Sequence, residues 1–302
     1  ANVFSGQFTR AALGSTRIGD QHYAMPLSYY AWGFFYSKSL FQDLQIAPPK
    51  TWDEFLAVCA RLKAQGVAPT AVGAKAGWPA AAWFDYLNLR MHGLEFHQKL
   101  LRGEARFSDP RVRAVLVQGH ELLQRGNFLE EALQQDWDGV LPYLYRRQVG
   151  MVLMGGFAAA KFPEGALGGR NVADDIGFFP FPSIHPKVGN FEDAPLDVLV
   201  MPTSGKNTTA ALKLLRYLSN PSVMNPYNRA IRQLSPRKDS AATDDVFLNA
   251  GKAVLDQADG IAFFFDRDAR EPLVGPAFEA FRQFLQAPHD VDGTLAQLQS
   301  VR

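Results

Sequence analysis

The spacing of hydrophobic and polar positions along the chain predicts alternating helices and strands. In residues 50–66 (KTWDEFLAVCARLKAQG), apolar positions recur every three or four residues, the repeat of a helix with one buried face. Thr51 and Glu54 have the spacing of a capping box, and Gly66 stands where a helix commonly ends. Residues 149–156 (VGMVLMGG) instead form a continuous apolar run that ends in two glycines, which predicts a buried strand followed by the start of a helix.

The same criteria predict elements along the rest of the chain. We expect further helices at 80–93, 108–126, 141–148, 207–220, 275–287 and 290–300, and further strands at 21–26, 67–73, 175–183 and 195–207. Ser108 is the expected N-cap of its helix, and Pro221 is expected to end the helix before it. The prolines in 175–183 favour an edge strand or a crossover. Because helices and strands alternate, the predicted fold class is α/β.

The composition is that of an ordinary globular protein. The 302 residues are 47% hydrophobic and 20% charged, and they suffice for two domains of ordinary size. The formal net charge is +1 and no long run of Lys or Arg occurs, so neither nucleic acid nor an anionic membrane is expected as a partner. The apolar runs are shorter than a membrane-spanning helix requires.

Cysteine and histidine usage limits the chemistry further. Cys59 is the one cysteine, which excludes an internal disulfide and a cysteine metal cluster. The six histidines do not have metal-ligand spacing, so no metal and no cofactor are expected. The chain starts with Ala1 and has no signal-peptide layout, which predicts that a signal was removed or that the chain begins inside a longer protein.

Four stretches carry a resemblance to a known family. The first runs from Tyr23 to Gly73 and contains YAMP, YSKSLF and PPKTWDEF; the others are RRQVGMVLMGGF (146–157), DVLVMPTSGKNTTAALKLLRYLSNPSV (197–223) and FFFDRDAREPLVGPAFEAFRQFLQAPHDVDGTLAQLQ (263–299). Together they resemble the extracellular solute-binding proteins of ABC sugar importers, the maltose-binding-protein-like group. The resemblance covers nearly the whole chain from about Gly19.

This resemblance implies a fold, a function and partners. The implied fold is the two-lobe periplasmic-binding-protein type II fold, with crossover strands at the hinge. The implied function is to bind a mono- or oligosaccharide between the lobes and deliver it to the membrane permease of an ABC transporter. The implied location is the periplasm or the outer cell surface, and no catalytic activity is expected.

The resemblance also implies a division into lobes. Residues 1–26 and 203–260 are expected to form the N-terminal lobe, and residues 27–202 and 261–302 the C-terminal lobe with the hinge crossovers. Family members usually have several βα units before the YAMP strand, whereas only about 20 residues precede it here. The N-terminal lobe is therefore expected to be incomplete, since so small a part buries little surface. A fragment, a natural truncation and completion by another chain remain as explanations.

Aromatic residues are the candidate sugar platforms, because the C–H faces of a sugar stack on rings. The stretch PLSYYAWGFFYSK holds six of them, and a strand would point them to both faces. We expect Tyr30 and Trp32 to contact the ligand, with core packing as the alternative. Trp78, in a Gly-Trp-Pro loop, and Phe157, at a family position that is usually Trp, are the other expected platforms. For Trp137, a contact in the ligand cleft and a structural role are equally supported by the sequence.

Charged residues are the candidate partners of the sugar hydroxyls, which need directed donors and acceptors. We expect Asp85, Asp197, Asp266 and Arg267 to supply them. For Asp85, the alternative is a solvated helix face. For Asp197, the alternative is a hinge role or an internal ion pair, because a carboxylate in a buried strand needs a partner. For Asp266 and Arg267, the alternative is a hinge salt bridge.

Two other functions compete with sugar transport. One is a carbohydrate-active enzyme such as a glycoside hydrolase, since the 30 acidic residues can offer two carboxylates. No Gly-x-Ser-x-Gly motif occurs, and no particular pair of acids is singled out. The other is a truncated paralogue that acts only through protein contacts.

Overall fold

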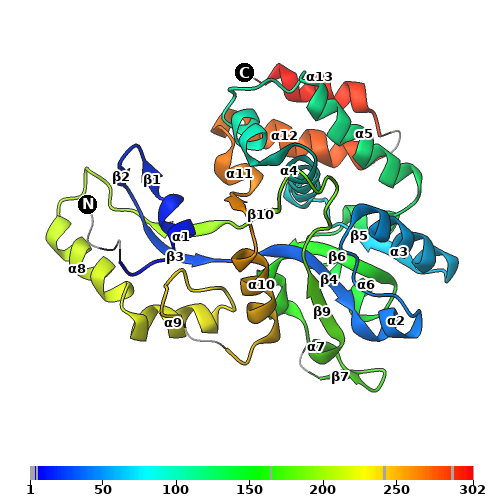
Figure 1. The fold of residues 1–302 in the computed structure, drawn as a ribbon, viewed down its shortest axis with the longest axis horizontal. Helices are drawn as coiled ribbons and strands as arrows, with labels where there is room; N and C mark the ends of the chain where they lie inside the picture. Colours follow the sequence, from blue (N-terminus) through cyan, green and yellow to red (C-terminus); the bar gives the residue numbers. More distant parts are fainter. Residues whose placement is uncertain (1–3, 5, 164, 241–242, 287–288, 302) are drawn as a thin grey trace.

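A four-stranded mixed sheet forms the centre of the larger body of the protein (Figure 1). The computed structural model describes residues 4, 6–163, 165–240, 243–286 and 289–301, and the fold is α/β as predicted. The strand order is β5 (Ala68–Ala71), β6 (Val149–Gly155), β4 (Trp32–Ser37) and β9 (Ile176–Phe179). β6 is parallel to β5 and antiparallel to β4, which is also antiparallel to β9. All of β6 is buried, as its apolar run predicted, and β9 lies at the edge of the sheet, as the prolines in 175–183 predicted.

Helices pack on this sheet and contribute most of the core. The longer ones are α3 (Trp52–Ala64), α4 (Trp78–Leu101), α5 (Pro110–Gln124), α12 (Glu271–Phe284) and α13 (Val291–Ser300). The shorter elements are α2 (Lys38–Asp43), η1 (Glu130–Gln134), α6 (Leu141–Tyr145), η2 (Gly156–Lys161), α7 (Val172–Asp175), α11 (Phe265–Asp268) and the hairpin of β7 (Ala166–Leu167) and β8 (Arg170–Asn171). α3 begins with the predicted capping box, in which the Glu54 amide donates to Thr51 Oγ1 and the Thr51 amide donates to Glu54 Oε2.

Several predicted boundaries are wrong. α4 begins at Trp78, directly after Gly77 at φ +80°, so Trp78 belongs to a helix and not to a loop. α5 is capped by Asp109 and not by Ser108, because the Asp109 carboxylate accepts a hydrogen bond from the Arg111 amide. Pro221 does not merely end a helix; it is the first residue of the next one, where its missing N–H costs nothing.

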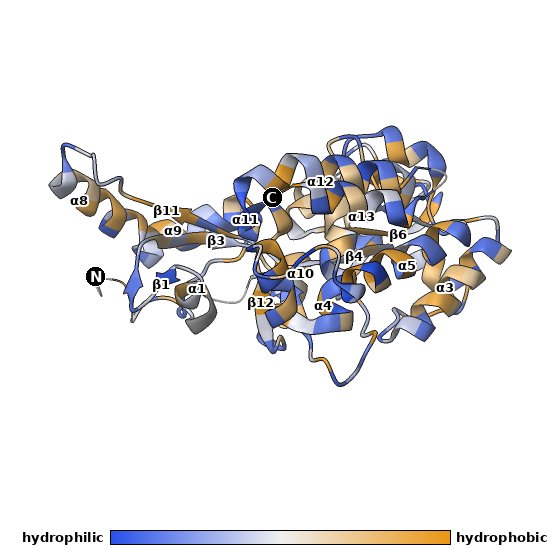
Figure 2. Cartoon of the chain, turned by 90° about the horizontal axis from the view of Figure 1, so that it is seen from above, coloured by the Kyte–Doolittle hydropathy of each residue, from blue (hydrophilic) through white to orange (hydrophobic). Residues whose placement is uncertain are grey.

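A narrow arm extends from the larger body (Figure 1). It contains β3 (Met25–Tyr29), paired antiparallel with β11 (Leu196–Leu199), together with α1 (Arg10–Gly14), β1 (Arg17–Ile18), β2 (Gln21–His22), α8 (Thr208–Leu218) and α9 (Pro221–Ala230). Figure 2 shows hydrophobic positions along α8 and α9. Yet α8 has no buried residue, and its Leu214 and Tyr217 are 55% and 62% exposed. The arm therefore presents apolar side chains that its own residues do not cover.

Three chain segments lie side by side near the junction of the arm and the larger body; the first two join the arm to the larger body, and the third joins two elements that pack on the larger body. The first, residues 29–32, joins β3 to β4; the second, residues 193–196, joins β10 (Phe191–Asp193) to β11; the third, residues 262–265, joins β12 (Gly260–Ala262) to α11. β10 and β12 are parallel, and the Ala194 amide donates to the Ala262 carbonyl at 3.0 Å. α10 (Val246–Asp256), which precedes β12, packs on β9 and η2 of the larger body.

Candidate functional site

Six aromatic rings gather beside the crossovers, and we call them the aromatic cluster. Its members are Tyr30, Trp32, Trp78, Trp137, Phe157 and Phe264. Tyr30 and Phe157 meet edge to face at 5.1 Å between ring centroids, and Trp137 meets Phe157 at the same distance. Trp78 is 6.3 Å from both Trp137 and Phe157. The structure thus brings together all four rings expected from the sequence, although their ligand contacts remain predictions.

Glycine makes this close approach of rings feasible. Gly155 ends β6 opposite Trp32, and a Cβ on it would lie 2.4 Å from a Phe157 ring carbon and 3.1 Å from a Tyr30 ring carbon. The Gly156 amide donates to the Ala31 carbonyl at 2.8 Å, which ties η2 to the first crossover. A larger residue in place of Gly155 would push the rings apart.

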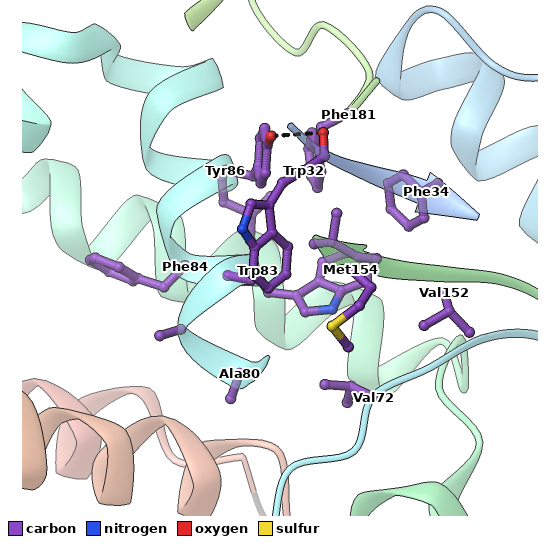
Figure 3. Close-up of a cluster of buried hydrophobic side chains, with 14 of the residues drawn as sticks. Trp32, Phe34, Val72, Ala80, Trp83, Phe84, Tyr86, Val152, Met154 and Phe181 are labelled. Atoms are coloured by element: carbon purple, nitrogen blue, oxygen red, sulfur yellow. Dashed lines mark hydrogen bonds between the residues drawn. The ribbon is translucent and has the colours of Figure 1, made fainter. Parts of the chain in front are cut away.

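The rings differ in how much surface they offer. Trp32 is 1% exposed, and Phe264 stacks on it at 4.8 Å with an interplanar angle of 18°. Figure 3 shows Trp32 among other buried side chains, with the Tyr86 hydroxyl bonded to its carbonyl oxygen at 3.1 Å. Trp32 therefore supports the cluster from within, so the structure shows the core packing that was the alternative to the predicted ligand contact of this ring.

The other predicted rings are half-buried and keep surface free for contact. Tyr30, Trp78, Trp137 and Phe157 all belong to this group. Burial raises the pKa of the Tyr30 hydroxyl above its usual range, so it stays protonated and can donate a hydrogen bond at physiological pH.

A charged network lies next to these rings and spans the crossovers. The Ser28 hydroxyl of β3 donates to Asp197 Oδ2 of β11 at 3.0 Å, and Arg267 Nη1 of α11 donates to Asp197 Oδ1 at 3.2 Å. Arg267 Nε also lies 4.0 Å from Asp266 Oδ1. Asp197 thus has the internal ion pair that was the alternative to ligand binding. Because Arg267 and Asp197 keep 45% and 35% of their side chains exposed, a ligand hydroxyl can still reach them.

Asp85 has a different role from the one expected. Its carboxyl group is fully buried in α4, where Oδ2 accepts a hydrogen bond from the Phe265 amide at 2.9 Å. Oδ1 lies 3.8 Å from His97 Nε2. The prediction of Asp85 as a ligand acceptor on a helix face is therefore wrong for this structure, since the carboxyl group holds α11 against α4. The turn of the helix that carries it faces the core.

Sequence reasoning missed one member of the cluster. Phe264 is buried and lies within 6.1 Å of Trp78 as well as stacking on Trp32. Its signal was the FFF run just before Asp266 at the expected third crossover. Elsewhere in the described ranges, no group of three His, Cys, Asp or Glu side chains is arranged to hold a metal ion. None of the described helices is both long and apolar enough to cross a membrane.

Three adjacent crossovers lie beside partly exposed rings and a charged network, an arrangement typical of ligand sites next to a hinge. Over residues 1–225 the chain matches the family described as bacterial extracellular solute-binding protein, and it belongs to that family. Its fold is the type II fold of the sugar-binding members of this class.

Individual relatives agree with this assignment. The chain is 29% identical over 229 residues to an uncharacterised ABC transporter extracellular-binding protein of Pyrococcus horikoshii, covering 74% of this chain and 49% of that protein. It is 24% identical over 223 residues to the multiple sugar-binding protein of Streptococcus mutans, covering 70% and 50%. The chain therefore spans about half the length of the curated relatives it matches.

A solved structure is similar over nearly the whole chain. The bacterial solute receptor AcbH, described as having an exclusive preference for β-D-galactopyranose, superposes with a TM-score of 0.87 at 28% identity. The match covers 98% of this chain and 76% of that chain. The family and these relatives are binding proteins, not enzymes. This finding argues against the alternative that the chain is a glycoside hydrolase.

Proposed function

We propose that the chain binds a carbohydrate on the aromatic cluster and delivers it to the membrane permease of an ABC transporter. The observation that carries the proposal is the gathering of the half-buried rings of Tyr30, Trp78 and Phe157 beside Asp197 and Arg267. The rings offer faces for the C–H groups of a sugar, and the charged groups offer directed hydrogen bonds for its hydroxyls. A neutral polyhydroxylated ring matches both.

The relatives support this class of ligand. One of them is named as a multiple sugar-binding protein, another as an α-glucoside-binding periplasmic protein of Rhizobium meliloti, and AcbH is described as preferring a galactopyranose. The proposed location is accordingly the periplasm or the outer cell surface, where a binding protein can meet both its sugar and the permease. The charged network that joins the three crossovers is the proposed hinge.

The arm is proposed to be part of the N-terminal lobe, for which the sequence predicted residues 1–26 and 203–260; within that range α10 packs on the larger body instead. Residues 27–202 and 261–302 are then the C-terminal lobe with the hinge. The uncovered apolar side chains of α8 favour this division, because a lobe that has its full complement of α/β elements would bury them. About a quarter of the AcbH chain has no counterpart in this one, which is enough for such a complement. Closure over Tyr30 would then need that further part.

Calorimetry with galactose, maltose, trehalose and xylose tests the proposed function. The titrations are run on residues 1–302 and on the longest chain that the neighbouring coding sequence supplies. Binding of at least one sugar is expected, with about a fivefold or greater loss for Trp78→Ala, since one ring contact contributes about 1 kcal/mol or more. Tyr217→Ala, which removes an exposed ring on α8, is the matched control and should bind normally.

Two results would contradict the proposal. A folded longer chain that binds none of the sugars would favour a protein that acts only through protein contacts, for which the exposed face of α8 is suited. Equal affinity of the wild type and Trp78→Ala would mean that sugar binds elsewhere.

A further inference from the structure

α4 packs on both β10 and α11, and each of these three elements carries a carboxyl group near the third crossover; we call the three groups the buried carboxyl cluster. They belong to Asp85 of α4, Asp193 at the end of β10, and Asp268 at the end of α11. Asp85 and Asp193 are 0% exposed.

These carboxyl groups have few partners of their own. Neither side-chain oxygen of Asp193 has a hydrogen-bond partner among the described residues, and the same holds for Asp85 Oδ1 and Asp268 Oδ2. Two or three ionised carboxylates in such a place would repel one another without hydration to offset the cost.

The positive groups nearby are engaged elsewhere. Arg90 donates to Glu192 Oε1 at 2.5 Å and to the carbonyls of Phe181 and Phe191. Arg267 is bonded to Asp197 outside the cluster. The charge of Arg102 acts on Asp268, where it lowers the pKa against the larger effect of burial. Within the described residues, no cation is among the main influences on the pKa values of Asp85 and Asp193.

The remaining titratable neighbours also favour protonated carboxyl groups. Burial lowers the pKa of His97 to about 3, so its imidazole is neutral beside Asp85. Burial, and then the charge of Asp193, raises the pKa of Asp85 well above its usual value. Burial, and then the charges of Asp268, Glu192 and Asp266, does the same for Asp193. The other titratable neighbours, Tyr30 and Tyr86, have pKa values raised by burial and carry no charge near neutral pH.

The cluster is connected directly to the candidate sugar site through α11. The Phe265 amide donates to Asp85 Oδ2 at 2.9 Å, which docks the start of α11 on α4. The residue before it is Phe264, whose ring stacks on Trp32, and Arg267 follows within the same helical turn. Any displacement of α11 therefore moves an aromatic ring and a charged group of the site together.

We propose that the buried carboxyl cluster is a proton switch that controls the docking of α11 on α4 and, through it, the candidate sugar site. When Asp85 and Asp193 hold their protons, α11 stays docked and Phe264 supports Trp32. When the protons are lost, repulsion favours the undocked arrangement, in which the carboxylates reach water. The effect on sugar affinity rests on the proposed function; the docking itself does not.

The direction in which docking changes with pH follows from proton linkage. The docked state binds more protons than the undocked state, so the docked fraction falls as pH rises above the ordinary carboxyl pKa of about 4. Each retained proton changes the docking constant by up to about tenfold per pH unit until the raised pKa is passed.

The test follows the sugar-free chain from pH 5 to pH 9 by thermal midpoint, tryptophan fluorescence and hydrogen exchange at the Phe265 amide. In the wild type, we expect the midpoint to fall, the fluorescence to change and the protection factor of the Phe265 amide, corrected for the base-catalysed intrinsic exchange rate, to fall as pH rises. Asp193→Asn removes the charge with little change of shape and should flatten all three profiles. Asp53→Asn, at an exposed position on α3, is the matched control and should keep the wild-type profile.

The outcomes separate the switch from the proposed function. Identical profiles for the wild type and Asp193→Asn would overturn the switch, as would a midpoint that rises with pH in the wild type alone. If Asp193→Asn does not fold, Asp268→Asn serves the same purpose at a less buried position. If the pH profiles behave as expected but no sugar binds, the switch stands and the proposed function fails. Where a sugar does bind, its affinity should fall with pH in the wild type and not in Asp193→Asn.

Discussion

Replacing Trp32 by Ala should lower the stability of the protein, because the ring is part of the core. The ring is 1% exposed, stacks on Phe264 at 4.8 Å, and meets Trp78 and Phe157 edge to face at 5.9 and 6.2 Å. Its Nε1–H has no partner among the described residues, so the change removes packing and leaves no new unpaired group. Truncation of a buried Trp to Ala typically costs about 3–5 kcal/mol, because a cavity replaces the ring.

The prediction is checked by urea and thermal unfolding of Trp32→Ala beside Trp78→Ala. For a body of this size, about 2–4 °C accompanies each kcal/mol, so the Trp32→Ala midpoint should fall by about 6–20 °C. Trp78→Ala should lose clearly less, because Trp78 is half-buried and part of its ring already contacts water. Trp32→Phe should lie between the wild type and Trp32→Ala, since it keeps an aromatic ring against Phe264.

The outcome that would refute this reasoning is equally specific. If Trp32→Ala unfolds at the wild-type midpoint and urea concentration but no longer binds sugar, Trp32 is a ligand platform and its burial against Phe264 is not what stabilises it. If both variants lose the same stability, the difference in exposure between Trp32 and Trp78 does not govern their contributions.

Two further predictions concern the larger body. Arg90→Met should lower the free energy of unfolding by about 3–5 kcal/mol, because it leaves the buried Glu192 carboxylate without its cation; adding Glu192→Gln should recover part of the loss in urea unfolding. Equal losses in the single and double variants would contradict this account. Burial raises the pKa of the Cys59 thiol to about 12, so a thiol reagent at pH 8 should label it only after unfolding; rapid labelling of the native protein would argue against its burial.

Local features were predictable because their causes lie within a few residues. The α3 helix follows from its apolar repeat and from the capping pair of Thr51 and Glu54, and it forms where predicted. The apolar run of β6 likewise requires no distant partner to be recognised. The predicted end at residue 93 is confirmed as a break within α4, since Gly93 at φ +82° is non-helical and divides the element into two helices.

The site was predictable in part. Tyr30, Trp78 and Phe157 were singled out from a family pattern and from their residue type, and the fold brings their rings together. Phe264 was not singled out, because its place in the cluster depends on stacking on Trp32, which lies 232 residues earlier in the chain.

By itself, the sequence of this protein determined the α/β class, most of its helices and strands, and which side chains could meet a sugar. Only the tertiary structure decided which of those side chains face the surface. Asp85 shows the physical reason: its polarity suggested an exposed acceptor, but the amide of Phe265, 180 residues away in sequence, is its hydrogen-bond partner in the core. Periodicity encodes which face of a helix is apolar, whereas burial and charge depend on what the fold packs against that face.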